Sequence, residues 1–270
     1  MKDHSSRHIQ DRFIGFLKMP SLWHGKLNGL TQFDYSFDYQ KFDSLINPKL
    51  RLGKYVEQYI FFCLKNDSEF TDIVENIQIH NKKITVGEID YLFKKSAVPY
   101  HLELSCKFYV VDFSRGNKEI EFCIGPNNKD SLVEKLTRIQ NHQLPLLHKD
   151  ITLQYLENIN FDPTKTIQQV LFKCQLFLPL THLEYRFKKL NNECIYGFYL
   201  RPNELKKFSN HKFHIPTKKD WLISPHTNVN WMDYESFRTE IKTFMKRENS
   251  PMCWLKTNTG ELTKFFVLWW

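Results

Sequence analysis

Two neighbouring segments, residues 86–93 and 101–109, alternate in side-chain character along their length, and this pattern constrains the fold most. Because successive side chains of a β-strand point to opposite faces, the alternation predicts two strands. One face of the first segment carries Val86, Glu88, Asp90 and Leu92. One face of the second carries His101, Glu103, Ser105, Lys107 and Tyr109, opposite an apolar face of Leu102, Leu104, Cys106 and Phe108. A hairpin between the two strands would bring Asp90 beside Glu103.

Two carboxylates that converge repel each other, and a hard divalent cation relieves that repulsion through oxygen coordination. A lysine beside them can stabilise charge on a reacting phosphate. This combination suits phosphodiester hydrolysis assisted by Mg²⁺ or Mn²⁺. The alternative is an exposed amphipathic hairpin whose acids and lysine face water or form weak cross-strand pairs. The aromatic and apolar neighbours of the acids favour the metal-binding interpretation, because acids in such surroundings are usually paired or bind metal.

At these residues the chain resembles the bacterial DUF1853 proteins, which are assigned to the PD-(D/E)XK nuclease-like superfamily. The resemblance rests on Leu52-Gly53 through Glu57, Gly87-Glu88-Ile89-Asp90, His101 through Tyr109, Gly125-Pro126-Asn127 and Gln143-Leu144-Pro145, with weaker matches at Tyr196-Gly197-Phe198 and Lys219 through Leu222. It implies an α/β, restriction-endonuclease-like core, in which helices flank a mixed central sheet. It also implies Mg²⁺-dependent cleavage of nucleic acid, with DNA favoured over RNA.

Carried over by position, the resemblance makes Asp90 the metal-binding acid, Glu103 the second acid and metal ligand, Lys107 the signature lysine, and Glu57 a helix-borne acid that assists. The usual motif separates the second acid from the lysine by one residue, whereas three residues separate Glu103 from Lys107. Four steps along a strand span about 13 Å instead of about 7 Å. A β-bulge or a leaning lysine stem would recover contact, but Ser105 cannot replace a carboxylate. The alternative function is therefore a catalytically inactive nuclease-fold module that binds nucleic acid or a protein partner.

Two predicted helices carry further candidate residues. Apolar residues recur at helical spacing over residues 49–65, and Glu57 lies at the margin of that stripe. A second helix follows the turn at residues 125–128 and is expected to end at Pro145, with Lys135 and Gln143 near its apolar face. Together with Glu88 and Ser105, these two residues form a second tier of site candidates. The alternatives are a solvated glutamate, a helix-end glutamine that caps carbonyls, and a lysine that reaches water.

The length of 270 residues is compatible with one large α/β domain or two smaller ones. We expect an aromatic-rich N-terminal cover over residues 1–47, a nuclease-like core over 48–150 and a smaller β-rich C-terminal part over 151–270. A short helix is expected near residues 11–17, strands near 169–176, 193–200, 253–255 and 264–268, and a late helix over 233–246. The tryptophans of the last part can stack bases, bind a partner or fill a core.

The formal charge of +8 favours contact with a polyanion, although the lysine pairs that contribute to it are scattered in sequence. No apolar run reaches membrane-spanning length and the first residues lack the apolar core of a secretion signal, so a cytoplasmic location without membrane contact is expected. The six cysteines lack paired metal spacing, which favours reduced thiols. Walker, dinucleotide-binding, Gly-x-Ser-x-Gly and His-Glu-x-x-His motifs do not occur in the sequence.

Overall fold

The computed structural model describes residues 2–270, with side chains from His8 onward. Within this range the chain is a mixed α/β protein with a nine-stranded mixed sheet, in which the strand order is β3-β4-β5-β7-β8-β11-β10-β9 and β6 pairs with β5. A separate two-stranded ribbon is formed by β1 (Lys26–Leu27) and β2 (Leu30–Thr31). The mixed α/β class predicted from the sequence is confirmed.

The backbone contacts group the chain into two compact units, each assembled from separate segments. We call residues 23–106 and 134–173 the hairpin unit. Residues up to 22, 107–133 and 174–270 form the mixed-sheet unit. The consecutive three-part division expected from the sequence stays a prediction about domains.

The hairpin unit contains α2 (Leu52–Asn66), β3 (Phe70–Asn81), β4 (Ile84–Lys95), most of β5 (Val98–Val111), most of α4 (Leu132–Arg138), α5 (Asp150–Asn158) and the first part of β7 (Ile167–Pro179). The helix predicted over residues 49–65 and the strands predicted around Asp90 and Glu103 are confirmed as α2, β4 and β5. The helix expected to end at Pro145 instead continues from α4 through a π-helical turn, Ile139–Gln143, into a 3₁₀ turn, Leu144–His148. The proline is tolerated there because it occupies the first turn of the 3₁₀ segment, where the missing N–H has no partner to lose.

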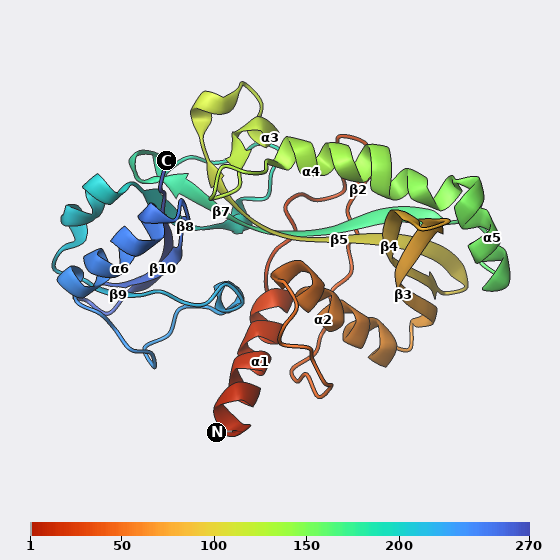
Figure 1. Cartoon of the computed structure of the whole chain (residues 1–270), viewed down its shortest axis with the longest axis horizontal. Coiled ribbons are helices and arrows are strands. Elements are labelled where there is room, and N and C mark those ends of the chain that lie inside the picture. Colours follow the sequence, from red (N-terminus) through yellow and green to blue (C-terminus); the bar gives the residue numbers. More distant parts are fainter. Residues whose placement is uncertain (1) are drawn as a thin grey trace. The chain divides into compact units, whose positions relative to one another are not determined.

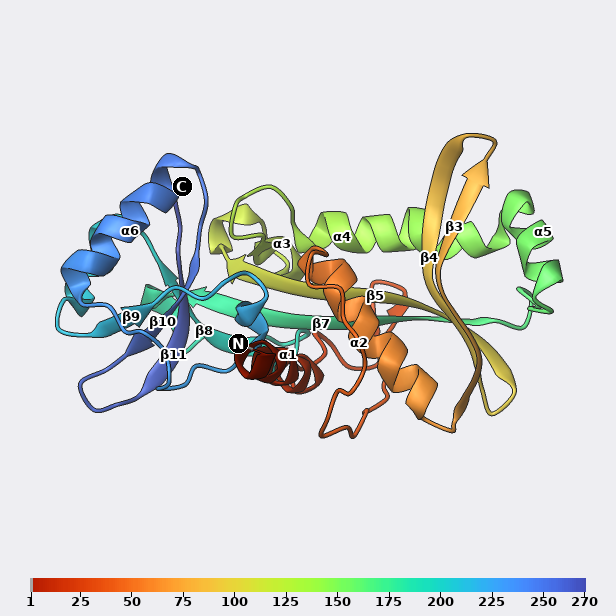
Figure 2. The same ribbon diagram turned by 60° about the horizontal axis from the view of Figure 1, so that its bottom comes forward.

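Strand β4 changes partners along its length. It pairs with β3 from Ile84 to Lys95, but with β5 only from Tyr91 to Lys95. The first half of β4 therefore leaves β5 and continues with β3 as a twisted two-stranded arm (Figure 2). Helices α2 and α4 lie on opposite sides of these strands (Figure 1). Side chains from both helices can consequently approach the point where β4 and β5 separate.

Buried apolar side chains hold the hairpin unit together. Ile77, Ile79, Ile89, Leu92, Leu146, Leu147, Leu156 and Phe161 form one cluster, which ties the arm to the segment after α4. Phe33 packs against Phe70 and Phe93, and Phe42 packs against Tyr59. The expectation that Trp23, Phe33, Phe37 and Phe42 pack on the core is confirmed, since all four are buried.

The mixed-sheet unit contains α1 (Lys2–Leu17), α3 (Glu119–Phe122), β6 (Cys123–Ile124), β8 (Ile195–Leu200), β9 (Lys212–His214), α6 (Tyr234–Lys246), β10 (Met252–Lys256) and β11 (Leu262–Val267), with the ends of β5 and β7. Strand β8 runs parallel to β7 and β11, whereas β10 is antiparallel to β9 and β11. Helix α6 begins after Asp233, whose carboxylate accepts from the Ser236 N–H at 2.8 Å. The strands predicted near 169–176, 193–200, 253–255 and 264–268 and the late helix are confirmed, while α1 is longer than expected.

No helix within residues 2–270 combines the length and the apolar character needed to cross a membrane. All six cysteines are free thiols, and five of them are buried. The prediction of reduced core thiols therefore holds for those five, and Cys106 is only half-buried.

Candidate metal centre

Helix α2 supplies two charged side chains to the centre, Lys54 and Glu57. The helix forms because Leu52, Val56, Ile60 and Cys63 recur at helical spacing and are all buried. Glu57 lies beside that stripe and is only 9 % exposed. The Tyr91 hydroxyl donates to the backbone carbonyl of Glu57 at 2.6 Å, which fixes this turn of α2 against β4.

Asp90 occupies the position where β4 separates from β5. The last paired residues on that side are Tyr91 and Leu102, so the backbone of β5 beyond them has no partner strand in β4. The Asp90 carboxylate replaces the missing backbone acceptor of β4 and accepts from the Leu104 N–H at 2.8 Å. Since a buried backbone donor rarely lacks a partner, the aspartate is tied to the geometry of the hairpin.

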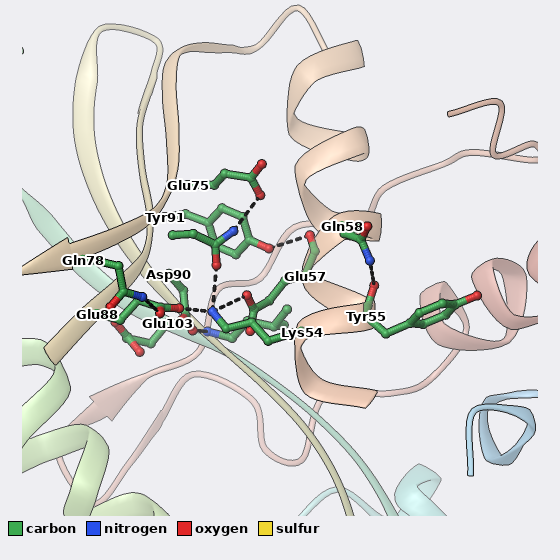
Figure 3. A network of polar contacts seen from close by, with 12 residues as sticks. Lys54, Tyr55, Glu57, Gln58, Glu75, Gln78, Glu88, Asp90, Tyr91 and Glu103 are labelled. Carbon is green, nitrogen blue, oxygen red and sulfur yellow. Dashed lines mark hydrogen bonds and ion pairs between the residues drawn. The ribbon is translucent and has the colours of Figure 1, made fainter. Parts of the chain in front are cut away.

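Three carboxylates meet at this point. Each of Glu57, Glu88 and Asp90 offers an oxygen, and these oxygens all lie within 4.8 Å of one another. Lys54 donates to Glu57 Oε2 at 2.8 Å, to Asn76 Oδ1 at 2.7 Å and to Glu88 Oε1 (Figure 3). Gln78 of β3 donates to the other oxygen of Glu88. We call Glu57, Glu88 and Asp90 the acidic cluster.

Glu103 is fully buried next to Asp90 and is held by neutral donors. His101 Nε2 lies 2.9 Å from Glu103 Oε1, and the Gln143 amide donates to Oε2. Gln143 in turn accepts from the Lys135 ammonium at 2.9 Å. The second-tier candidates Lys135 and Gln143 are thus brought to Glu103, and Lys135 lowers the pKa of that carboxyl group electrostatically.

The hydrogen bonds of His101 fix its tautomer. The Gln168 amide nitrogen donates to the Leu144 carbonyl at 2.6 Å and lies 2.9 Å from His101 Nδ1. An amide nitrogen only donates, so Nδ1 accepts and the proton is on Nε2, which donates to Glu103. Burial lowers the pKa of His101 to about 4, so the ring stays neutral at pH 7. His101 therefore orients the carboxylate without neutralising it.

Burial raises the pKa values of three acids, Glu57, Asp90 and Glu103. Desolvation, together with the charge of Asp90, raises the pKa of Glu57 to about 7. Desolvation and the neighbouring Glu103 raise the pKa of Asp90 to about 7. Desolvation also raises the pKa of Glu103 to about 7, although Lys135 and hydrogen bonds from Asp90 act against it. Near pH 7 the group holds negative charge at a cost in free energy, which a bound cation would reduce.

Lys107 and Ser105, the two remaining candidates from the sequence, make no recorded contact with Glu57, Glu88, Asp90 or Glu103. Lys107 belongs to the mixed-sheet unit and donates to the Asp130 carboxylate at 2.6 Å. Ser105 is buried, and its hydroxyl has no hydrogen-bond partner among the described residues. Strand alternation places it on the same side of β5 as Glu103.

Sequence reasoning assigned no role to Lys54, Gln78, His101 or Gln168, although all four contact the acids or their partners. The signal for Lys54 was present, because it lies three residues before Glu57 and so on the same side of α2. The alternation did place His101 on the strand face of Glu103, but it did not show that the ring contacts the carboxylate. Gln78 and Gln168 depend on tertiary contacts that no local pattern reveals.

The donor set fits a hard divalent cation. All the oxygens of the acidic cluster are carboxylate oxygens, the ligands that Mg²⁺, Mn²⁺ and Ca²⁺ prefer, and cysteine or histidine ligands that would favour zinc do not belong to it. The fold and this centre define a mixed α/β protein with a buried acidic group that can hold a metal ion. The chain belongs to the DUF1853 family, whose model, described as "Domain of unknown function (DUF1853)", matches residues 27–267. Searches of curated proteins and of solved structures gave no match.

Proposed function

We propose that this protein is a cytoplasmic phosphodiesterase that cleaves nucleic acid with Mg²⁺ or Mn²⁺ through a PD-(D/E)XK-like site. The observation that carries the proposal is the convergence of Glu57, Glu88 and Asp90 within 4.8 Å, at the opening between two strands. Burial of this much negative charge costs stability, so its presence is better explained by function than by folding. The restriction-endonuclease-like character of the hairpin unit is part of the proposal.

The roles of the side chains follow from their contacts. Glu57, Glu88 and Asp90 would hold the cation, which when bound would supply Lewis acidity. Glu103, next to Asp90, completes the ligand set or accepts the proton of the attacking water, and His101 and Gln143 keep it oriented. The oxygen of that water bonds to phosphorus, the ester P–O bond to the leaving oxygen breaks, and the leaving oxygen takes a proton from solvent water. A lysine stabilises the charge that develops on the phosphate.

Nucleic acid is the proposed substrate because the chain carries a formal charge of +8. A basic protein attracts a phosphate backbone without reading its sequence, and such affinity falls as salt is added. DNA is favoured over RNA on the resemblance to PD-(D/E)XK nucleases.

The second candidate is an inactive module of the same fold that binds nucleic acid or a protein. The ion pair of Lys107 with Asp130 favours it, since the lysine expected from the signature is committed to another carboxylate. In that case the acidic cluster would bind an ion without cleaving a substrate.

The decisive experiment measures cleavage of single- and double-stranded DNA and RNA with Mg²⁺ or Mn²⁺, comparing the natural chain with Asp90→Ala. We expect cleavage that requires the metal and falls at least about 100-fold in the variant, the scale for loss of a group essential to electrostatic stabilisation. Glu157→Gln, which removes an exposed acid of α5, is the matched control and should cleave normally. Absence of cleavage by a folded natural chain on every substrate would leave the inactive module as the better account.

A pair of variants compares Lys135 with Lys107 as the lysine that stabilises the charge developing on the phosphate in the transition state. If Lys135 does so, Lys135→Ala should lower kcat by about 10- to 1000-fold, while Lys107→Ala should change it less than about threefold. The reason is that Lys135 reaches Glu103 through Gln143, whereas Lys107 pairs with Asp130. The reverse order in steady-state cleavage rates would restore the assignment carried over from the superfamily.

A further inference from the structure

The acidic cluster already holds a cation, which is the ammonium group of Lys54. This nitrogen donates to Glu57 and Glu88, two of the three carboxylates of the cluster, and to the Asn76 side chain (Figure 3). Its contacts are therefore all oxygens and two of them are charged. The Lys54 side chain is 40 % exposed, whereas those of Glu57 and Glu88 are 11 % and 23 % exposed. The lysine thus reaches the acids from the solvent side.

Lys54 contacts two of the three carboxylate groups that would coordinate a divalent ion, Glu57 and Glu88. An ion held by these groups would lie close to the ammonium group, and two positive charges so close repel strongly in a partly buried site. Because the side chain is long and partly exposed, it can rotate outward without disturbing α2. Binding of an ion would consequently release the ammonium group at the rim of the cluster.

A buried polar group on the Glu103 side of β5 also lacks a hydrogen-bond partner. Ser105 is only 4 % exposed, and strand alternation places it on the Glu103 side of β5. Its hydroxyl has no hydrogen-bond partner among the described residues. A buried hydroxyl without a partner costs about 1–3 kcal/mol. A water or a substrate oxygen on this side of β5 would give it that partner.

We propose that Lys54 is a built-in competitor of the metal ion and that, once displaced, it binds the phosphate of the substrate. This inference rests on the proposed function and adds a form of regulation to it, in which ion and phosphodiester bind cooperatively. The anion supplies a new partner for the displaced ammonium group and so reduces the cost of displacing it. By linkage, the ion must then increase phosphate affinity by the same factor.

The test is Mn²⁺ binding by the full-length chain, followed through the electron paramagnetic resonance signal of free Mn²⁺, with and without dimethyl phosphate. Lys54→Met should bind Mn²⁺ more tightly than the natural chain by a factor of about 5–150, and dimethyl phosphate should no longer strengthen binding. Lys54→Gln should behave similarly and guards against misfolding of one variant. Lys83→Met, which removes the same charge from the exposed end of the hairpin, should behave like the natural chain.

Two further outcomes separate the inference from the proposed function. If Lys54→Met binds Mn²⁺ no more tightly than the natural chain while Asp90→Asn loses binding, the metal centre stands and the competition by Lys54 is refuted. If Asp90→Asn binds Mn²⁺ as tightly as the natural chain does, or if both chains fail to bind Mn²⁺, the hypothesis of a metal centre is refuted. The inference about Lys54 is then refuted as well.

Discussion

Exchanging Asp90 for asparagine is expected to stabilise the metal-free protein by roughly 1–3 kcal/mol at pH 8 while abolishing stabilisation by Mn²⁺. The asparagine keeps an oxygen that can accept from the Leu104 N–H, so the structural role of the side chain is preserved. What it removes is a buried negative charge beside Glu103 and Glu57. Stability and metal binding should therefore change in opposite directions, as expected of a site that is strained for function.

The stability that Asp90→Asn gains without metal should increase as the pH rises. The pKa of Asp90 is about 7 in the folded protein, above the value of about 3.9 typical of an unfolded chain. The folded state then binds more protons than the unfolded state between these values, so the natural chain loses stability as pH rises from about 4 to about 7. The advantage of Asp90→Asn should be small near pH 4, grow through this window and level off above it.

Urea unfolding of both chains at several pH values, with and without Mn²⁺, measures these effects. Glu157→Gln is the control for loss of an acid and should show no such growth, since the residue is exposed. If Asp90→Asn is less stable than the natural chain at pH 8 without metal, the carboxylate contributes to folding. If Mn²⁺ still raises the free energy of unfolding of the variant, Asp90 is not a ligand of the metal ion.

Replacing Gly197 by alanine should cost about 3 kcal/mol or more, because the added methyl group has no room in the mixed-sheet unit. A Cβ at this position would lie 1.9 Å from the backbone carbonyl oxygen of Lys264 in β11, the strand that pairs with β8. Backbone cannot move aside as a flexible side chain can, so the β8–β11 pairing would have to open. Pairing of Gly197 with Phe177 of β7 on its other side restricts that movement further.

Thermal unfolding checks this prediction, with an expected fall in Tm of about 6–12 °C for a chain of this size. Gly53→Ala is the control, because its Cβ would meet nothing within 4 Å and it lies inside α2, where alanine is favoured over glycine by up to about 1 kcal/mol. The two glycine substitutions should therefore have opposite signs. Equal Tm values for Gly197→Ala and the natural chain would mean that β8 and β11 leave room for a methyl group at this position, contrary to the 1.9 Å approach.

The parts of the fold that follow a single period could be read from the sequence. Helix α2 keeps its apolar stripe, and β4 and β5 keep their alternation, so the residues around Asp90 and Glu103 were expected on adjacent strands. Strand β3 was not predicted, because its register with β4 shifts between Thr71 and Val74 and again between Ile79 and His80. Asp72 and Asn76 also have positive φ angles. Such irregularities interrupt the alternation from which a strand is recognised.

The composition of the centre was only partly predictable for a similar reason. Gln143 lies in a π-helical turn, which adds residues to each turn and so shifts side chains away from the positions that an α-helical period assigns. The contact of Lys135 with Gln143, and of Gln143 with Glu103, depends on that shift. Strand spacing placed Lys107 on the Glu103 side of β5, but it could not reveal that Asp130 would pair with it.

The interleaving of the two compact units affects how the chain can fold during synthesis. Helix α1 belongs to the mixed-sheet unit, and the guanidinium of Arg12 finds its partner, Asp220, 208 residues later. The hairpin unit can be completed once residue 173 has left the ribosome, whereas α1 must wait for most of the remaining chain. Until then α1, whose Phe13 and Phe16 are fully buried in the finished structure, lacks its contacts with the segment Asp220–Leu222. The nascent protein therefore passes through a long interval in which an early helix is open to chaperones or to aggregation.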